Sequence, residues 1–161
     1  MRFSIGILIA VSVLAFSSTH AQNPNQKAAV NDSQVRPPVT KADIEIVRRA
    51  RQILNSAAKW NREDNRVCPT DAKKFSLYCA LEKATDEVSG NFEHRSAAMQ
   101  EARFVIDEVL AKGNKYEHRL MNYNNDPKTT FADVQKFFNL LEERIQKRLE
   151  EQNRQGKRPL A

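Results

Sequence analysis

Residues 130–149, TFADVQKFFNLLEERIQKRL, contain the clearest helical pattern in the chain. Thr130 and Asp133 have the spacing of a capping box, in which two side chains satisfy each other's backbone N–H groups. Apolar residues then recur every three or four positions, which is the period of one helix face. The stretch therefore predicts an amphipathic helix with one buried face. Its apolar positions are Val134, Phe137, Phe138, Leu141, Ile145 and Leu149.

An earlier segment repeats this arrangement. Thr40 and Asp43 have the spacing of a second capping box. The apolar residues that follow predict a helix running from Thr40 toward Trp60, with the intervening basic residues in solvent. They are Ile44, Val47, Ala50, Leu54, Ala57 and Ala58, widened by Ile46, Ile53 and Trp60.

Two more helices are predicted between these segments. One covers roughly residues 71–89, with Ser76 as an alternative start and Gly90 as the residue that ends it. The other runs from about Arg95 to Ala111 and is ended by Gly113. Their apolar positions are Leu77, Leu81, Ala84 and Val88 in the first, and Ala98, Ala102, Val105, Ile106, Val109 and Leu110 in the second.

The remaining segments lack periodicity. Residues 114–123 are expected to form a loop, and Asn-Asn-Asp-Pro at 124–127 a turn, because Asn and Asp bond their own backbone and Pro fixes φ. No segment shows the alternation of a strand. The sequence therefore predicts an all-α fold, a compact bundle of about four helices over residues 40–152.

The first 21 residues have the three parts of a secretory signal peptide. A positive charge at Arg2 precedes about a dozen apolar residues, and Thr19 and Ala21 supply a cleavage site. The apolar run is shorter than the roughly 20 residues of a membrane span, so we expect no transmembrane segment after cleavage. We expect an exported protein, periplasmic or extracellular, with a flexible linker at 22–39 and a basic tail at 153–161.

Composition restricts the function. Of the 161 residues, 40% are hydrophobic and 29% charged, which is enough apolar material for one helical core. The net charge of +6 favours acidic partners or anionic surfaces. The 4 glycines are scattered, so no glycine-rich phosphate loop is present, and no nucleic-acid-binding motif is found. We therefore expect no cofactor and no nucleic-acid partner.

Two cysteines, Cys68 and Cys79, are present. An exported protein folds in an oxidising compartment, so we expect the two to form a disulfide. Closing so short a loop stabilises a fold by roughly 3 kcal/mol in the chain-entropy model. The alternative is two free, buried thiols.

Two stretches resemble the pattern of a known family. Residues 78–84 read Tyr-Cys-Ala-Leu-Glu-Lys-Ala, and residues 123–134 contain Tyr-Asn-Asn-Asp-Pro followed by a Thr-to-Val helix start. Together they are similar to an uncharacterised family of small bacterial helical proteins, a domain of unknown function with a Cys-x-Leu-Gly helix start and a Trp-Asn-Asp-x-Pro turn. Glu82 replaces the glycine, and Asn124 interrupts the Trp-Asn-Asp order. The resemblance covers roughly residues 44–149 and implies a helical fold without a known activity. We expect the matched residues to be structural, because a turn and a capping box are what a helix start requires.

The histidines are the main candidates for catalysis. His94 and His118 remain after signal cleavage, each preceded by a glutamate. Adjacent residues on a helix do not face each other, so a histidine–carboxylate pair would need convergence with another acid such as Asp126. Cys79 could act as a nucleophile only if it is not disulfide-bonded. The spacing matches no zinc motif, and we assign no catalytic residue and no metal ligand.

A small exported domain without a catalytic signature favours a non-catalytic module that binds a protein or a small ligand. Trp60 and Tyr123 are candidate binding residues if exposed, because aromatic side chains dominate binding hot spots; His94, His118 and Asp126 are further candidates. Trp60 has the alternative of packing against its own helix. Two other functions stay open: a hydrolytic or metal-dependent enzyme using His94 and His118, and binding to anionic surfaces. The surface would be the basic last helix and tail, with Arg144, Lys147, Arg148, Arg154, Lys157 and Arg158.

Overall fold

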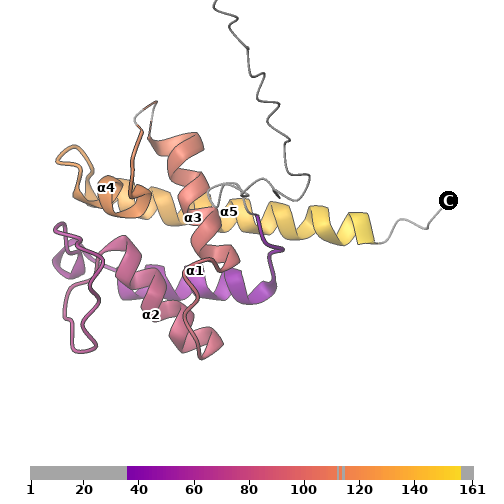
Figure 1. Cartoon of the computed structure of the whole chain (residues 1–161), viewed down its shortest axis with the longest axis horizontal. Helices are drawn as coiled ribbons and strands as arrows, with labels where there is room; N and C mark the ends of the chain where they lie inside the picture. Colours follow the sequence, from indigo (N-terminus) through magenta and orange to yellow (C-terminus); the bar gives the residue numbers. More distant parts are fainter. Residues whose placement is uncertain (1–35, 112, 114, 157–161) are drawn as a thin grey trace, which may run out of the picture. The chain divides into compact units, whose positions relative to one another are not determined.

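The computed structural model describes residues 36–111, 113 and 115–156. In chain order its helices are α1 (Lys41–Ile53), the 3-10 helix η2 (Ala57–Lys59), α2 (Leu77–Ser89), α3 (Ala97–Val105), the π-helical turn η3 (Ile106–Leu110), α4 (Arg119–Asn125) and α5 (Phe131–Gly156) (Figure 1). The β pairing in these residues is one isolated bridge between Trp60 and Phe75. The all-α prediction is confirmed. The predicted signal peptide at 1–21 and most of the predicted linker lie outside the described residues.

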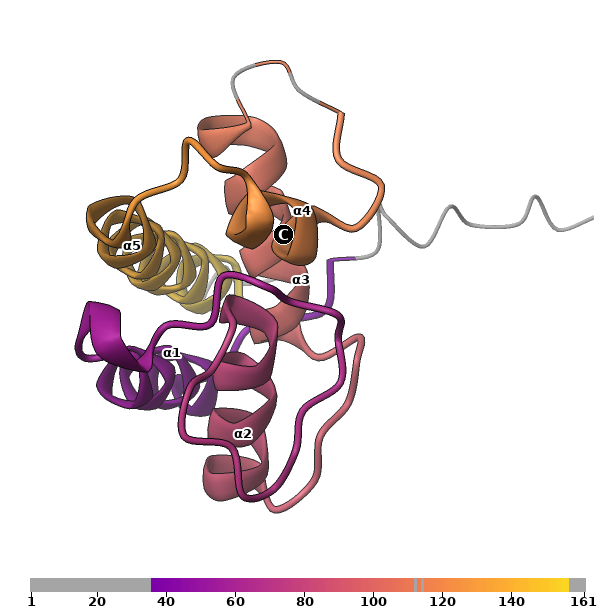
Figure 2. The same ribbon diagram turned by 90° about the vertical axis from the view of Figure 1, so that its left-hand side faces the viewer.

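The 26-residue helix α5 supports the rest of the fold. α1 and α3 both pack against α5, and α2 packs against α1 (Figures 1 and 2). The predicted apolar stripe of α5 forms the middle of the core. The rings of Phe137 and Phe138 pack edge to face there, with their centroids 5.2 Å apart. The fully buried stripe residues are Val134, Phe137, Phe138, Leu141 and Ile145.

The buried side chain of Asp43 fixes the starts of two helices. Its Oδ2 accepts a hydrogen bond from the backbone N–H of Thr40 at 2.7 Å, as the predicted capping box requires. Its Oδ1 accepts from the backbone N–H of Ala98, in the first turn of α3, at 2.9 Å. One carboxylate therefore satisfies N-terminal amides of both α1 and α3 and holds the two helix starts together.

Three other predicted helix boundaries are in place. The hydroxyl of Ser76 accepts from the backbone N–H of Cys79, which confirms Ser76 as the start of α2. Gly90 ends α2 with φ of +74°, a conformation that favours glycine. Thr130 and Asp133 form the capping box of α5.

Two segments differ from the sequence prediction. α1 ends at Ile53 instead of continuing toward Trp60, because Leu54 leaves the helical region with φ −95° and ψ 50°. Ala57 and Ala58 are consequently exposed. Residues 119–125, expected to be the end of a loop and the start of a turn, form α4. This short helix is held by its buried contacts rather than by an apolar pattern, which is why periodicity did not reveal it.

The end of α3 also differs. A regular helix was expected to residue 111, but residues 106–110 form a π-helical turn. A π turn contains an extra residue and changes the direction of the side chains after it. Val109, predicted to be in the core, is therefore 47% exposed.

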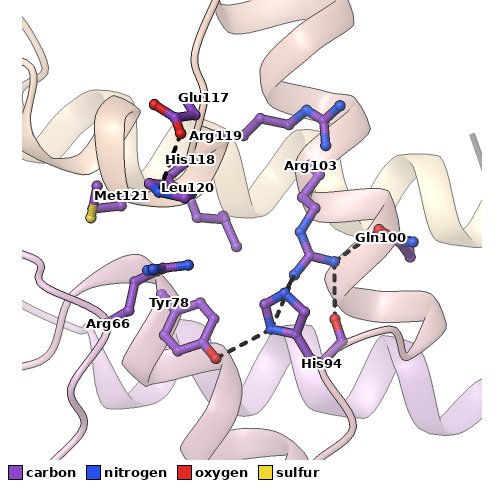
Figure 3. A pocket seen from close by; sticks show the side chains of 10 residues that line it. All are labelled: Arg66, Tyr78, His94, Gln100, Arg103, Glu117, His118, Arg119, Leu120 and Met121. Atoms are coloured by element: carbon purple, nitrogen blue, oxygen red, sulfur yellow. Dashed lines mark hydrogen bonds and ion pairs between the residues drawn. The ribbon is translucent and has the colours of Figure 1, made fainter. Parts of the chain in front are cut away.

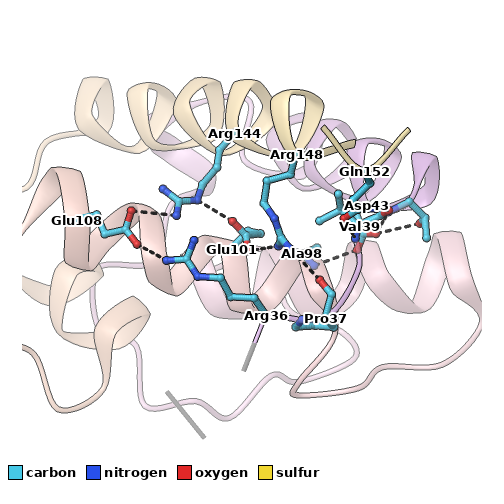
Figure 4. A network of polar contacts seen from close by, with 11 residues as sticks. Arg36, Pro37, Val39, Asp43, Ala98, Glu101, Glu108, Arg144, Arg148 and Gln152 are labelled. Atoms are coloured by element: carbon cyan, nitrogen blue, oxygen red, sulfur yellow. Dashed lines mark hydrogen bonds and ion pairs between the residues drawn. The ribbon is translucent and has the colours of Figure 1, made fainter. Parts of the chain in front are cut away.

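A buried carboxylate joins α3 to α5. The side chain of Glu101 is 0% exposed and accepts from Nε of Arg144 at 2.6 Å and from Nη1 of Arg148 (Figure 4). Arg144 also pairs with Glu108 at 2.9 Å. Removing a carboxylate from water costs several kcal/mol, and charged, hydrogen-bonded partners of this kind are needed to offset it.

The folded domain begins earlier than the predicted boundary at residue 40, and it also ends later, because α5 continues past residue 152 to Gly156. Val39 is 2% exposed, and its backbone N–H and C=O both bond the side-chain amide of Gln152, at 3.0 and 2.9 Å (Figure 4). Arg148 donates to the carbonyl oxygen of Pro37 at 3.3 Å. Residues 36–39 of the predicted linker therefore belong to the domain, because side chains of α5 satisfy their backbone groups.

The Glu101 network gives a stability prediction. Glu101→Ala leaves Arg144 and Arg148 beside each other without their shared carboxylate, and we expect it to lower the free energy of unfolding by about 3–5 kcal/mol. Denaturant unfolding followed by circular dichroism measures this loss. Glu150→Ala, on the exposed face of α5, is the control and should change stability by less than about 0.5 kcal/mol. A loss below about 1 kcal/mol for Glu101→Ala would contradict the assigned role.

Candidate functional site

A cavity of about 210 Å³ lies between α2, α3 and the start of α4 (Figure 3). Polar and charged side chains from four segments of the chain line it. Both histidines that the sequence offered as candidates face this cavity. Its lining consists of Arg66, Tyr78, His94, Gln100, Arg103, Glu117, His118, Arg119, Leu120 and Met121.

Arg103, on α3, is held in place by hydrogen bonds. Its Nη1 donates to the carbonyl oxygen of His94 at 3.0 Å and to Oε1 of Gln100 at 2.8 Å. Its Nη2 lies 2.8 Å from Nε2 of His94 (Figure 3). Because a guanidinium has no acceptor, the Nε2 of His94 accepts in this contact. The guanidinium is thus fixed beside the cavity before any ligand arrives.

Arg119 is oriented by the π-helical turn. Asp107 on η3 accepts from the Nε of Arg119 at 2.5 Å. Asp107 thus occupies the Nε edge of the Arg119 guanidinium. The Arg119 side chain is 22% exposed and lines the cavity. The irregular turn at the end of α3 therefore contributes to the site, as π turns often do.

Arg66 enters the cavity from the loop before α2. Its φ of +61° is in the left-handed region, which costs a residue with a Cβ roughly 1–2 kcal/mol. The loop offsets this cost through the bond from the backbone N–H of Arg66 to Oδ1 of Asp64 at 2.7 Å. The Arg66 guanidinium makes no hydrogen bond or ion pair with any described residue, so its donors face the cavity and solvent.

The cavity has an excess of positive charge. Arg66, Arg103 and Arg119 contribute three cations, and Asp107 balances that of Arg119. Glu117 is the acid among the lining residues, and its side chain is 89% exposed, where water weakens its field. The phenol of Tyr78 adds a neutral donor: burial, and then the charge of Glu82, raise its pKa above the ordinary value. The lining is thus suited to a negatively charged group.

The other candidate residues lie elsewhere. Trp60 and Tyr123 are buried in the core, at 7% and 6% exposure. Asp126 lies outside the cavity that contains the histidines: its Oδ2 accepts from the hydroxyl of Tyr116 at 3.0 Å, and its Oδ1 from the backbone N–H of Lys128. Those hydrogen bonds lower the pKa of Asp126. This is the turn-forming role expected of Asp before a helix.

The amide of Asn124 is the centre of a buried polar network. Its Oδ1 accepts from the indole N–H of Trp60 at 2.8 Å and from the backbone N–H of Leu77 at 3.1 Å. Its Nδ2 donates to the carbonyl oxygen of Asn61 at 2.9 Å and to Oδ1 of Asn125 at 3.0 Å. With 0% exposure, Asn124 uses its full hydrogen-bonding capacity inside the protein. It joins α4 to the loop after η2 and to the start of α2.

Asn125 and Arg62 extend this network along the loop. Asn125 Oδ1 accepts from the backbone N–H of Asp64 and its Nδ2 donates to the Asp64 carbonyl, both at 2.8 Å. Arg62 donates to the carbonyl oxygens of Asp126, Pro127 and Thr129 at 3.1–3.3 Å. The loop therefore has few regular hydrogen bonds of its own and is positioned by side chains around α4.

The loop is also held covalently. Cys68 and Cys79 form a disulfide with their Cα atoms 5.3 Å apart, as the sequence predicted. This excludes Cys79 as a nucleophile while the bond is intact. Cys79 lies in the first turn of α2, so the bridge attaches the loop to the start of that helix.

Among the described residues, no group of three or more His, Cys, Asp or Glu side chains is arranged to hold a metal ion. None of the described helices combines the length and hydropathy needed to cross a bilayer.

These features define a small all-α domain with a cationic cavity beside a disulfide-bonded loop. The chain belongs to a family of unknown function (DUF6197), whose model matches residues 38–144. The match confirms the resemblance seen at residues 78–84 and 123–134, and it includes every residue that lines the cavity. No curated protein and no solved structure is detectably similar to the chain.

The turn motif of the resemblance aligns without a gap when it is counted from its proline. Counting back from Pro127, the Asn of Trp-Asn-Asp-x-Pro falls on Asn124 itself, and the Asp falls on Asn125. Asn124 therefore keeps the pattern instead of interrupting it. At Asn125 the replacement has a physical reason, because its amide donates to the Asp64 carbonyl and an aspartate could not. The motif residues are structural in this protein.

Sequence reasoning missed the three arginines. They come from a loop, from α3 and from α4, and each has an ordinary surface-like neighbourhood in the sequence. The sequence offered one indication, which is that two of the arginines lie next to residues already considered as candidates. Arg66 lies two residues before Cys68, and Arg119 follows His118.

The Asn124 network gives a second stability prediction. Asn124→Ala leaves the Trp60 indole N–H, the Leu77 N–H and the Asn61 carbonyl without their partner, at about 1–3 kcal/mol for each buried group that stays unsatisfied. We expect unfolding free energy to fall by about 3 kcal/mol or more, measured by chemical denaturation.

Asn153→Ala, at an exposed position of α5, is the matched control and should lie within about 0.5 kcal/mol of the unaltered protein. Equal stability for the two variants would show that water replaces the amide and that Asn124 does not organise the loop.

Proposed function

We propose that this domain is a non-catalytic binding module whose ligand is a small molecule carrying an oxyanion, either a carboxylate or a phosphate group. The observation that supports the proposal is the convergence of Arg66, Arg103 and Arg119 on one cavity. Arginine presents its N–H donors in a planar fork that matches two oxygens of one anion.

Two properties of the cavity favour binding without large rearrangement. Arg103 is already fixed by His94 and Gln100, so little side-chain entropy is lost when it meets an anion. Arg66 supplies donors that no described residue uses. The loop position of Arg66 is set in turn by Asp64 and Asn125, so the site is assembled before the ligand binds.

The size of the cavity indicates a small ligand. Its volume of about 210 Å³ is below the roughly 300–1,000 Å³ of sites for drug-sized molecules. Leu120 and Met121 supply an apolar part of the wall, and Tyr78 supplies an aromatic ring with a hydroxyl. A compact anion with a short carbon skeleton would satisfy both the charged and the apolar lining.

The enzymatic alternative receives partial support from geometry. His94 and His118 line the same cavity. A hydrolytic mechanism needs a general acid and a general base in one site, and two histidines could supply them. However, the Nε2 of His94 is engaged by Arg103, and the described lining contains no Ser, Thr or Cys as a nucleophile. These observations favour binding over catalysis.

The anionic-surface alternative is weaker. Arg144 and Arg148, two of the basic residues on which it depended, are directed at the buried Glu101 and are only 20% exposed. Lys157 and Arg158 lie outside the described residues.

The binding proposal is tested with inorganic phosphate as the probe. We expect titration at constant ionic strength to cause saturable shifts of the amide and arginine Nε–H resonances around the cavity in ¹H–¹⁵N spectra. Arg66→Ala should weaken phosphate binding about tenfold, since a charge-assisted hydrogen bond contributes roughly 1.5–3 kcal/mol. The exposed position of Arg66 should leave the fold intact.

Arg154→Ala is the matched control, because it removes an exposed arginine on α5 that does not line the cavity. It should bind phosphate like the unaltered protein. Non-saturating shifts, or equal weakening by both substitutions, would indicate general attraction to the basic surface and contradict the proposal.

We also propose that the domain functions after export. The signal-peptide pattern at residues 1–21 and the Cys68–Cys79 disulfide support this, because disulfides persist in oxidising compartments. Intact mass spectrometry of the protein from its native host should show a chain that starts at Gln22. A mass that includes residues 1–21 would contradict export by cleavage.

A further inference from the structure

The disulfide connects two walls of the cationic cavity. Arg66, two residues before Cys68, lines the cavity from the loop side, and Tyr78, directly before Cys79, lines it from α2. Figure 3 shows the Arg66 guanidinium and the Tyr78 phenol on the two walls. The bridge therefore limits how far these two parts of the wall can separate.

The nearest attachments on the two sides of Arg66 are of different kinds. On the N-terminal side, Asp64 is held through its backbone by the side chain of Asn125. On the C-terminal side the nearest attachment is the disulfide, where Cys79 Sγ also lies 3.6 Å from the carbonyl oxygen of Val67. Val67 is itself 65% exposed and gives the loop no apolar anchor. Without the bridge, the next attachment on the C-terminal side is at Phe75, whose backbone bonds Lys59 and Asn61. Arg66 then lies in a longer unanchored segment, in a backbone conformation that is unfavourable by itself.

The disulfide can be reached from solvent. Cys68 and Cys79 both line a second cleft of about 150 Å³, which shares no lining residue with the cationic cavity. Cys68 is half-buried and Cys79 buried, so Cys68 is the more accessible sulfur. Accessible disulfides are the ones that exchange with external thiols.

The position of Cys79 makes it a suitable leaving group. The thiolate of a dithiol reductant would attack Sγ of Cys68, forming a mixed disulfide and releasing Cys79 as a thiolate. Cys79 is in the first turn of the 13-residue helix α2, where the helix dipole stabilises a negative charge. The second thiol of the reductant then attacks its own mixed-disulfide sulfur and releases Cys68. The protein gains two electrons and two protons, and the dithiol becomes a cyclic disulfide.

We propose that the Cys68–Cys79 disulfide is a redox control element of the anion site, so that the oxidised protein binds its ligand and reduction by a dithiol weakens binding by releasing Arg66. This inference rests on the proposed binding function. It assigns to the bond a regulatory effect on one side chain, in addition to its contribution to stability.

The test compares phosphate titrations of the oxidised protein and of protein reduced with dithiothreitol, each with Arg66 intact and with Arg66→Ala. We expect reduction to weaken phosphate binding about tenfold, and Arg66→Ala to weaken it about tenfold in the oxidised protein. In the reduced protein Arg66→Ala should have almost no further effect, because the guanidinium has already left the site. Cys68→Ser/Cys79→Ser should match the reduced protein without any reductant.

Arg154→Ala, which leaves the cavity unchanged, controls for general electrostatic effects in both redox states. Equal phosphate affinity before and after reduction would overturn the redox inference while leaving the binding function in place. The same holds if Arg66→Ala still weakens binding tenfold in the reduced protein. Loss of the helical circular dichroism signal on reduction would also overturn it, because the bond would then hold the whole domain. Absence of saturable binding in the oxidised protein would overturn the binding function itself, and the inference with it.

Discussion

A buried amide cannot be left without hydrogen-bond partners, and the side chain of Asn124 meets this requirement by joining three segments of the chain. Through it, α4 is fixed to the loop after η2 and to the first residue of α2. Those same three segments provide Arg119, Arg66 and Tyr78 to the cavity. The satisfaction of one polar group in the interior therefore determines which side chains meet at the surface. Asn124, which lies in the part of the chain that the family model matches, thereby joins three of the segments that line the candidate site.

The sequence predicted those features that depend on interactions between residues close together in the chain. Capping pairs such as Thr40–Asp43 and the apolar stripe of α5 depend on neighbours within one or two turns, so the helices they define were predictable. The disulfide followed from compartment and cysteine count. By contrast, α4 has only seven residues and is held by tertiary contacts, and the π turn at 106–110 has no periodic signature. The cavity depends on both of these and on the Arg66 loop, so its arginines could not be assigned in advance. The histidines were identified as residues, but their shared location was not.

The arginines illustrate why composition alone gives an incomplete account of function. Arg144 and Arg148 lie on the helix that seemed to offer a basic surface, yet they neutralise a carboxylate inside the protein. Arg66 lies in a polar loop without any distinctive pattern and keeps its donors directed at the cavity and solvent. The net charge counts an arginine that pairs with a buried acid and an arginine that faces a cavity in the same way. What separates them is whether an acid within the fold already occupies the guanidinium, and that depends on the packing of α3 against α5.

The π-helical turn at Ile106–Leu110 makes the domain sensitive to the length of this segment. Two consecutive acids on the turn make separate ion pairs: Asp107 pairs with Arg119 beside the cavity, and Glu108 pairs with Arg144 beside the buried Glu101. Deleting a single residue here would restore the regular pitch and rotate the following side chains by about 100°. A deletion before Asp107 would turn both acids away from their arginines. The length of this segment therefore matters more to these pairs than the identity of its exposed residues, such as Val109.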